Sequence, residues 1–454
     1  MTLELIKEIL PPEQAEQVLR FWPTLITAEK KLLSEQVQNI DFKRLKQQIK
    51  LIDKPDPLPE FAPYTEYAFS GNKTDFQHGK KLIREGKMGC IVLAGGQGTR
   101  LGFEGPKGLY PTTIIKHKTL FQICFERVLA ASKQAGCDLS IAVMTSSDND
   151  YATRQFLADQ NYFGLKSDQV SFYSQGTLPL LDAEGLLFLE QPYKIAEGPD
   201  GNGQCLHNFV KAGLWDEWKR KGIKYVNIVL IDNPLADPFD AELLGFHTRR
   251  KLEATVKCIE KLQPDENVGV LVKEKGHCRV IEYSELPEAE KNAVEPSGHL
   301  KYCCANLSLL CFSMDFISSV VNKHPHLPLH KSWKTSKFVN PIGITQTSTA
   351  PNAWKFENYI FDLLAYTNYT AALLYPRNLC YAPLKNYIGE NSIATVQESL
   401  LSFDQKILES ITGLPAPTSP FELSADFYYP TSKLLDFWKE REPDSPYVDP
   451  FVNE

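Results

Sequence analysis

Residues 93–108 read LAGGQGTRLGFEGPKG, and they directly follow an apolar run at residues 90–92. A short apolar run of this kind predicts a buried strand, here residues 90–93. The glycines of the stretch free the backbone to adopt positive φ and to approach a ligand closely, and they are Gly95, Gly96, Gly98 and Gly102. Because successive backbone N–H groups can form an anion-binding nest, the stretch predicts a phosphate-binding turn at the end of a strand.

Two cations lie in the same stretch. Arg100 can hold an anion with the fork of its guanidinium, and Lys107 can act as a point charge. This combination favours a triphosphate or pyrophosphate ligand, and a glycine-rich loop without a chemical role is the alternative. Two commoner phosphate motifs do not fit. A Walker loop needs Ser or Thr where this chain has Gly108, and a dinucleotide fingerprint that starts at Gly96 needs a glycine where it has Leu101.

The composition limits the class of partner. The chain has 454 residues, of which 43% are hydrophobic, and its formal net charge is −7. This length predicts two or three domains with packed interiors. The negative charge argues against nucleic acid or an anionic membrane as the main partner, so a bound anion needs a local basic cluster. The chain shows neither a signal-peptide pattern nor an apolar stretch of roughly 18 residues, so we expect a cytoplasmic protein.

Cysteines and histidines do not predict a metal site. The ten cysteines form no CxxC pair in a chain long enough to fold without disulfides, so we expect reduced thiols. Cys303 and Cys304 are adjacent in an expected strand, which predicts that they point to opposite faces and belong to the core. Residues 324–330, HPHLPLH, contain three histidines, but the prolines favour a loop over a zinc site.

Periodicity and chain breakers indicate the organisation. Residues 1–50 have helical spacing of apolar positions, and prolines predict an extended linker at residues 54–64. From about residue 86, strands alternate with helices, which indicates an α/β fold with a mostly parallel, doubly wound sheet. We expect three parts, namely a helical N-terminal domain with its linker (1–85), a main α/β domain (86–382) and a small C-terminal domain (383–454). The expected strands lie at residues 90–93, 139–144, 170–173 and 225–231.

Ligands of open parallel sheets bind outside the carboxyl ends of the strands. Besides the glycine turn, Gln175 follows the expected strand 170–173 and Asp232 follows the run 225–231. Asp232 is the candidate Mg²⁺ ligand, because Mg²⁺ prefers one or two carboxylates and completes its shell with water and phosphate oxygens. The alternative for Asp232 is a helix N-cap, with Asn233 and Pro234 turning the chain.

The chain resembles the eukaryotic-type UDP-N-acetylhexosamine pyrophosphorylases, whose signature reads LAGGQGTRLG followed by PKG. Both halves of this signature are present. Further motifs of the family continue in the same order over about 300 residues: QGTLP (175–179), PDGNG (199–203), IDN (231–233), EYSE (282–285), PNAWKFENYIFD (351–362) and APLKN (382–386).

The resemblance implies a Rossmann-like nucleotide-diphospho-sugar transferase (GT-A-like) fold, with a mixed, mostly parallel sheet and helices on both faces. It also implies that the main domain is a nucleotidyltransferase, which makes a UDP-sugar and pyrophosphate from UTP and a sugar 1-phosphate. The expected sugar is N-acetylglucosamine 1-phosphate, attacking the α-phosphorus of UTP in line. The implied cofactor is Mg²⁺, with Mn²⁺ as an alternative, and we expect a monomer or a weak homo-oligomer.

Roles for individual residues follow from the resemblance. Nucleotide binding is implied for Leu93, Ala94, Gly95, Gly96, Lys107, Gln175, Gly201, Asp232 and Lys355. Sugar binding is implied for Asn202, Glu282, Tyr283, Asn306 and Lys385, with Arg377 as a further basic position near Lys385. Charge neutralisation during the reaction is expected from Arg100, Lys107 and Lys385. Alternatives are a turn role for Gln175, surface positions for Glu282 and Tyr283, and an exposed lysine without function for Lys355, in a helix-like run.

The chain also departs from the family pattern. Leu309 and Leu310 replace an Asn-His pair beyond Asn306, the segment 232–237 is short, and so is the C-terminal part. Because these changes leave the nucleotide loop intact, UTP is better supported as donor than the acetamido sugar as acceptor. One alternative is therefore a UDP-glucose or broad-specificity UDP-sugar pyrophosphorylase. The more distant alternative is a non-catalytic sugar-nucleotide sensor, which should lack Arg100, Lys107 or Asp232.

Overall fold

The computed structural model describes residues 3–53, 59–296 and 298–451. The chain divides into two compact units by proximity in space. The smaller unit contains Met1–Pro59, Gln175–Gln204 and His326–Ile360, and the larger contains Glu60–Ser174, Cys205–Pro325 and Phe361–Glu454. These limits differ from the expected domain boundaries at residues 85 and 382, so the three-part division stays a prediction. Residues 54–58 of the expected linker lie outside the described residues.

An eleven-stranded mixed sheet forms the centre of the larger unit. Its main path runs β2 (Tyr67–Phe69), β19 (Thr370–Leu374), β11 (Ala254–Glu260), β14 (Cys304–Ser313), β10 (Tyr225–Leu230), β3 (Met88–Leu93), β4 (Ile141–Thr145) and β5 (Val170–Ser174). Neighbours on this path are parallel, except that β14 is antiparallel to both β10 and β11. Strand β14 also pairs with β12 (Val270–Glu274), which in turn pairs with β13 (His277–Ile281) and β1 (Ala62–Pro63). The four expected strands and the mostly parallel sheet are confirmed.

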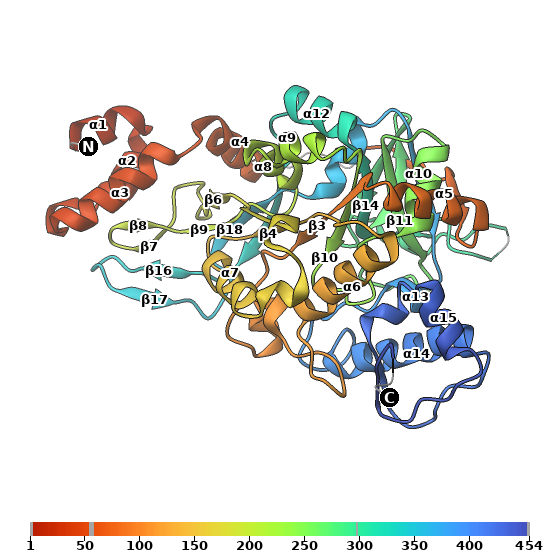
Figure 1. The fold of residues 1–454 in the computed structure, drawn as a ribbon. Helices are drawn as coiled ribbons and strands as arrows, with labels where there is room; N and C mark the ends of the chain where they lie inside the picture. The colour runs from red at the N-terminus through yellow and green to blue at the C-terminus, as the bar shows by residue number, and fades with distance from the viewer. Residues whose placement is uncertain (1–2, 54–58, 297, 452–454) are drawn as a thin grey trace. The chain divides into compact units, whose positions relative to one another are not determined.

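Helices cover both faces of this sheet (Figure 1). Along β3, Cys90 and Val92 share a core cluster with Phe121 of α6 (Leu120–Ala135). Gly89 faces the opposite side of the sheet, where a Cβ atom on this residue would lie 2.3 Å from Trp218 of α9 (Leu214–Arg220). Side chains alternate between the faces of a strand, so the run 88–93 is apolar throughout because both faces are covered. The other helices are α5 (Lys73–Arg84), α7 (Asp150–Asp159), α8 (Cys205–Lys211), α10 (Ala241–Arg249), α11 (Glu288–Lys291) and α12 (Met314–Lys323).

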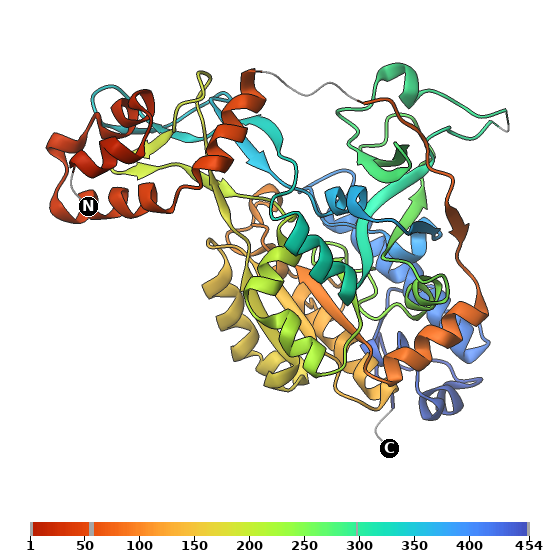
Figure 2. The ribbon, with the colours of Figure 1, turned by 90° about the horizontal axis from the view of Figure 1, so that it is seen from above.

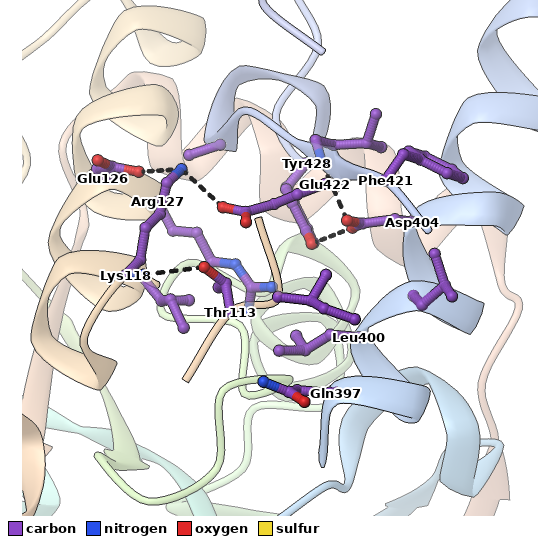
Figure 3. Close-up of a pocket in the computed structure, with 15 residues that line it drawn as sticks. Thr113, Lys118, Glu126, Arg127, Gln397, Leu400, Asp404, Phe421, Glu422 and Tyr428 are labelled. Carbon is purple, nitrogen blue, oxygen red and sulfur yellow. Dashed lines mark hydrogen bonds and ion pairs between the residues drawn. The ribbon is translucent and has the colours of Figure 1, made fainter. Parts of the chain in front are cut away.

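The C-terminal part of the chain, residues 377–451, belongs to the larger unit and forms a small core of its own. It contains α13 (Arg377–Cys380), α14 (Ile393–Thr412), β20 (Glu422–Leu423), α15 (Ser432–Trp438) and β21 (Tyr447–Val448). Leu408, Phe427 and Trp438 are among the buried residues of this core. Where the C-terminal part meets α6, buried charged side chains gather around a small cavity, which Figure 3 shows.

The smaller unit combines the expected N-terminal helices with short strand pairs (Figure 2). Its core joins Leu33 and Val37 of the helices to Leu189 and Ile195 of the strands. The helices are α1 (Leu3–Ile9), α2 (Pro12–Leu19), α3 (Thr27–Asn39) and α4 (Phe42–Asp53). The strand pairs are β6–β9 (Thr177–Pro179, Glu197–Pro199), β7–β8 (Leu189–Gln191, Lys194–Ile195), β15–β18 (His330–Lys334, Ala353–Glu357) and β16–β17 (Lys337–Val339, Thr345–Thr347).

All ten cysteines are free thiols. Cys304 is buried as expected, whereas Cys303 is only partly buried. The expectation of a strand at Cys303 was wrong, because β14 begins only at Cys304. His324 stacks on Tyr366, and no group of three His, Cys, Asp or Glu side chains in the described residues could hold a metal ion. Within the same residues, no helix is long and apolar enough to cross a bilayer.

Asp404, beside the cavity of Figure 3, makes the stability of the fold depend on pH. Burial raises its pKa to about 6, so the folded chain binds this proton more tightly than the unfolded chain does. The contribution of the protonated Asp404 carboxyl to the free energy of unfolding is therefore full below about pH 4. It is lost as the pH rises through about 6, and the free energy of unfolding falls by up to about 3 kcal/mol. Asp404→Asn should lose less stability than the wild type between pH 4 and pH 6.5, measured by thermal melts. The exposed control Asp436→Asn should follow the wild type, and parallel pH profiles of wild type and Asp404→Asn would contradict this assignment.

Candidate functional site

The glycine loop after β3 is closed by its own backbone. The Lys107 amide donates to the Gly96 carbonyl at 3.0 Å, and the Gly98 amide donates to the Gly105 carbonyl at 2.9 Å. Positive φ occurs at Gly102 (66°) and Gly105 (130°), whereas Gly95, Gly96 and Gly98 do not have it. The expectation of positive φ was therefore wrong for these three glycines, because the loop turns further along.

The glycines of the loop have different roles. A Cβ atom on Gly98 would lie 2.8 Å from Phe103, and one on Gly108 would lie 2.2 Å from Phe121, so these two positions are fixed by packing. Gly96 is exposed, and a Cβ atom there would meet nothing within 4 Å. The backbone at Gly96 is thus open to a ligand rather than to the protein.

Lys107 and Asp232 meet at the edge of the sheet. Strands β3 and β10 are parallel, with Leu93 opposite Leu230, so the segments that follow both strands leave the same edge. There the Lys107 ammonium donates to Asp232 Oδ2 at 3.2 Å, and the two side chains are 17% and 15% exposed. The sequence patterns predicted separately that Lys107 and Asp232 each follow a strand at this edge. In the structure the two residues form one ion pair, which is partly accessible to a ligand.

The segment that carries Lys385 is attached to the same turn. The Leu384 amide donates to the Asp232 carbonyl at 2.7 Å. The Asn233 side chain donates to the Cys380 carbonyl at 2.8 Å and accepts from the Ala382 amide at 3.0 Å. The N-cap alternative for Asp232 was wrong, because the next helix, α10, is capped by Asp240.

Arg100 and Lys385 are both exposed. In the described part of the chain, neither side chain forms a hydrogen bond or an ion pair, so both remain available to an anion. Arg100 lies within the glycine loop, and the loop after Lys385 approaches it, because a Cβ atom on Gly102 would lie 3.7 Å from Tyr387. Arg377 instead forms an ion pair with Glu266.

Glu282 and Asn306 lie on either side of one glycine. The Asn306 amide donates to the Gly269 carbonyl at 2.8 Å, and a Cβ atom on Gly269 would lie 2.9 Å from Glu282 Oε1. Tyr283 is 42% exposed. Leu309 and Leu310 are fully packed in β14, at 2% and 0% exposure. The replacement of the family's Asn-His pair by Leu309 and Leu310 therefore changes the core of the sheet.

Four other predicted site residues lie in the smaller unit. Gly201 has φ 86°, and a Cβ atom there would lie 2.3 Å from the Asn358 carbonyl oxygen. Asn202 Oδ1 accepts from the Ile360 amide at 2.9 Å, so this side chain has a structural role in the free protein. Lys355 lies on strand β18, not in a helix as expected, and donates to Glu357 at 2.9 Å. The fourth residue, Gln175, begins the segment that follows β5.

Asp200, within the PDGNG motif, was not among the site residues predicted from the sequence. Asp200 is 8% exposed, and one of its carboxylate oxygens, Oδ1, has no hydrogen-bond partner among the described residues. Burial raises the pKa of Asp200 to about 6, although the nearby Arg44 guanidinium acts in the opposite direction. A Cβ atom on Gly176 would lie 2.7 Å from this carboxylate, so the carboxylate packs closely against Gly176. The only sequence signal was an acidic residue inside a glycine-rich motif.

Asp232 is the residue that could hold a divalent cation. Lys107 engages one carboxylate oxygen, and no cluster of three ligands exists among the described residues. Mg²⁺ is commonly held by one or two carboxylates, with water and substrate phosphates completing its shell. A single carboxylate beside a phosphate-binding loop fits that mode of binding, which needs the nucleotide as a second ligand.

Known proteins share this fold. A Trypanosoma brucei structure of uridine diphosphate N-acetylglucosamine pyrophosphorylase has a TM-score of 0.80 and 23% identity, and the match covers 99% of this chain and 98% of that one. An Entamoeba histolytica protein assigned as a UDP-N-acetylglucosamine pyrophosphorylase has a TM-score of 0.78 at 27% identity, covering 86% and 100%. A UDP-glucose phosphorylase of Trypanosoma brucei is more distant, with a TM-score of 0.62 at 20% identity, covering 78% and 75%. The fold is thus that of the UDP-sugar pyrophosphorylases.

The sequence agrees with this class. UDP-N-acetylglucosamine diphosphorylase 2 of Arabidopsis thaliana is 32% identical over 403 residues, which cover 83% of this chain and 78% of that protein. The UDP-N-acetylglucosamine pyrophosphorylase of Saccharomyces cerevisiae is 31% identical, with 79% and 77% covered. Residues 33–365 match the model of the UTP–glucose-1-phosphate uridylyltransferase family. The chain belongs to this enzyme family, and the resemblance inferred from the motifs is confirmed.

Proposed function

We propose that the protein transfers the uridylyl group of UTP to N-acetylglucosamine 1-phosphate, giving UDP-N-acetylglucosamine and pyrophosphate. The observation that carries the proposal is the Lys107–Asp232 pair beside the open backbone of Gly96. The similarity to proteins named as UDP-N-acetylglucosamine pyrophosphorylases supports the choice of sugar. Ten free thiols agree with a reducing compartment, which supports a cytoplasmic location.

The reaction brings two anions together, so its main requirements are positioning and neutralisation of charge. In the proposed reaction a phosphate oxygen of the sugar 1-phosphate attacks the α-phosphorus of UTP, and the bond to the pyrophosphate oxygen breaks. The attacking phosphate is already ionised, so no general base and no covalent enzyme intermediate are needed. Lys107 and Arg100 would offset the charge on the triphosphate, and Lys385 would offset that on the sugar phosphate.

Asp232 would hold Mg²⁺, or Mn²⁺, together with the nucleotide phosphates. When bound, the cation supplies Lewis-acid stabilisation of the charge on the phosphate oxygens. The Lys107–Asp232 contact keeps both groups partly out of water before substrate binds, which favours rigid placement of the two charges. The nucleotide contacts of Gln175, Gly201 and Lys355 and the sugar contacts of Asn202, Glu282, Tyr283 and Asn306 remain proposals that rest on the matched motifs.

A UDP-glucose or broad-specificity pyrophosphorylase is the second candidate, favoured by the description of the matching family. The departures at Leu309 and Leu310 do not favour either sugar, because both side chains are buried in the core of the sheet. The test is a pyrophosphate-release assay with UTP, Mg²⁺ and a panel of sugar 1-phosphates. We expect N-acetylglucosamine 1-phosphate to react fastest, with UDP-N-acetylglucosamine as the product. A rate that is at least tenfold higher with glucose 1-phosphate would overturn the sugar assignment. Absence of release with every sugar would favour the sensor alternative.

A further inference from the structure

A buried arginine holds the turn that carries Asp232. Arg127 lies on α6 and is 3% exposed. Its Nη1 donates to the carbonyl of Pro234 and, at 3.4 Å, to that of Ala236. A guanidinium is costly to remove from water unless acceptors replace the lost hydration. Here the acceptors for Nη1 are main-chain carbonyls two and four residues beyond Asp232, whereas Nε and Nη2 have no hydrogen-bond partner in the described part of the chain.

The C-terminal part of the chain supports this arginine. The Arg127 guanidinium lies over the Tyr428 ring, 4.0 Å from its centre. The Tyr428 hydroxyl donates to Asp404 on α14, whose other carboxylate oxygen accepts from the Leu423 amide at 3.0 Å. Figure 3 shows Arg127, Tyr428 and Asp404 around one small cavity, of about 40 Å³. A continuous chain of contacts therefore runs from α14 to the Asp232 turn.

The neighbouring tyrosine holds the far end of the same turn. The Tyr429 hydroxyl donates to the partly buried carboxylate of Asp237, which also accepts from the Phe239 amide at 2.9 Å. The turn is therefore held at Asp232 by Lys107 and by the Leu384 amide, in its middle by Arg127, and at its end by Tyr429.

We propose that Arg127 is a positioning residue for the reaction, which holds the 232–237 turn so that Asp232 faces Lys107 and the substrate phosphates. Tyr428 and Tyr429 complete this support from the C-terminal part of the chain. The inference rests on the proposed function, because positioning has a kinetic consequence only if Asp232 acts in uridylyl transfer. A placement error of about 1 Å in such a reaction costs up to about 10²-fold in rate.

The test compares two buried cations of the same cavity. Lys118 is 5% exposed and pairs with Glu126 and Glu422, but it has no contact with the 232–237 turn among its described interactions. Arg127→Met should lower kcat by about 10- to 100-fold and leave the KM for UTP within about threefold. Lys118→Met should lower the melting temperature to a similar degree while keeping kcat near the wild-type value. If Arg127→Met does not fold, Tyr429→Phe takes its place, with a smaller expected loss in kcat.

A double variant separates positioning from general damage. In the Asp232→Asn background, Arg127→Met should reduce kcat by less than about threefold further, because residues that act through one group are not additive. Equal losses of kcat in Lys118→Met and Arg127→Met, or additive losses in the double variant, would overturn the inference. If the wild type itself releases no pyrophosphate from UTP with any sugar 1-phosphate, the proposed function fails. If the wild type is active and Arg127→Met keeps its kcat, only the positioning role fails.

Discussion

Asp232→Asn should reduce the turnover of pyrophosphate release by about 10²-fold or more, as expected for the loss of electrostatic stabilisation at a phosphoryl centre. Asparagine keeps the shape of the side chain and can still accept the hydrogen bond from Lys107, which spans 3.2 Å in the wild type. The substitution therefore removes the negative charge with little change in packing. It should also raise the concentration of Mg²⁺ needed for half-maximal rate.

The measurement is a Mg²⁺ titration of the steady-state rate with UTP and N-acetylglucosamine 1-phosphate. Asp216→Asn provides the control, because Asp216 is an exposed aspartate on α9. Asp216→Asn should show the kinetics of the wild type. Unchanged turnover of Asp232→Asn at limiting Mg²⁺ would mean that Asp232 only shapes the turn through its contacts with Lys107 and Leu384.

Local sequence patterns predicted the edge of the sheet well. The apolar run 90–93 and the glycines that follow it predict a buried strand and a turn, because both features depend on neighbouring residues alone. The parallel pairing of β3 with β10 then explains why residues 125 positions apart, Lys107 and Asp232, form one pair. The antiparallel direction of β14 was not predictable, because an apolar run does not encode strand direction.

The supports of the site depend on contacts between distant residues. From the sequence alone, Arg127 of α6 would be expected at the surface, as arginines usually are. Its contacts with Pro234 and Tyr428 join residues that are far apart in the sequence. Asn358 likewise packs against Gly201 from 157 positions away. The role of Gly96 was likewise not predictable, because a sequence does not distinguish a glycine that a turn requires from one whose backbone is open to a ligand.

Gly96→Val should abolish detectable UTP binding while the protein stays folded. Gly96 does not adopt positive φ, and a side chain there has no protein atom within 4 Å of its Cβ, so valine is compatible with the free protein. The added methyl groups would occupy the space where the backbone approaches the nucleotide. We expect affinity to fall by about 10²-fold or more, which corresponds to about 3 kcal/mol.

Gly108→Val is the comparison within the same loop. Its Cβ atom would lie 2.2 Å from Phe121, so this variant should lower the melting temperature through a packing clash. Gly96→Val should instead melt within about 2 °C of the wild type, since small surface changes have little effect on stability. The two variants therefore separate loss of a ligand site from loss of the fold.

Calorimetric titration of UTP into folded Gly96→Val, beside the wild type, tests most directly whether the glycine loop is the nucleotide site. We expect a saturable binding heat for the wild type and none for the variant, at matched thermal melts. Wild-type affinity for UTP in the folded variant would contradict this assignment of the nucleotide site, because the nucleotide would then bind away from Gly96, Lys107 and Asp232.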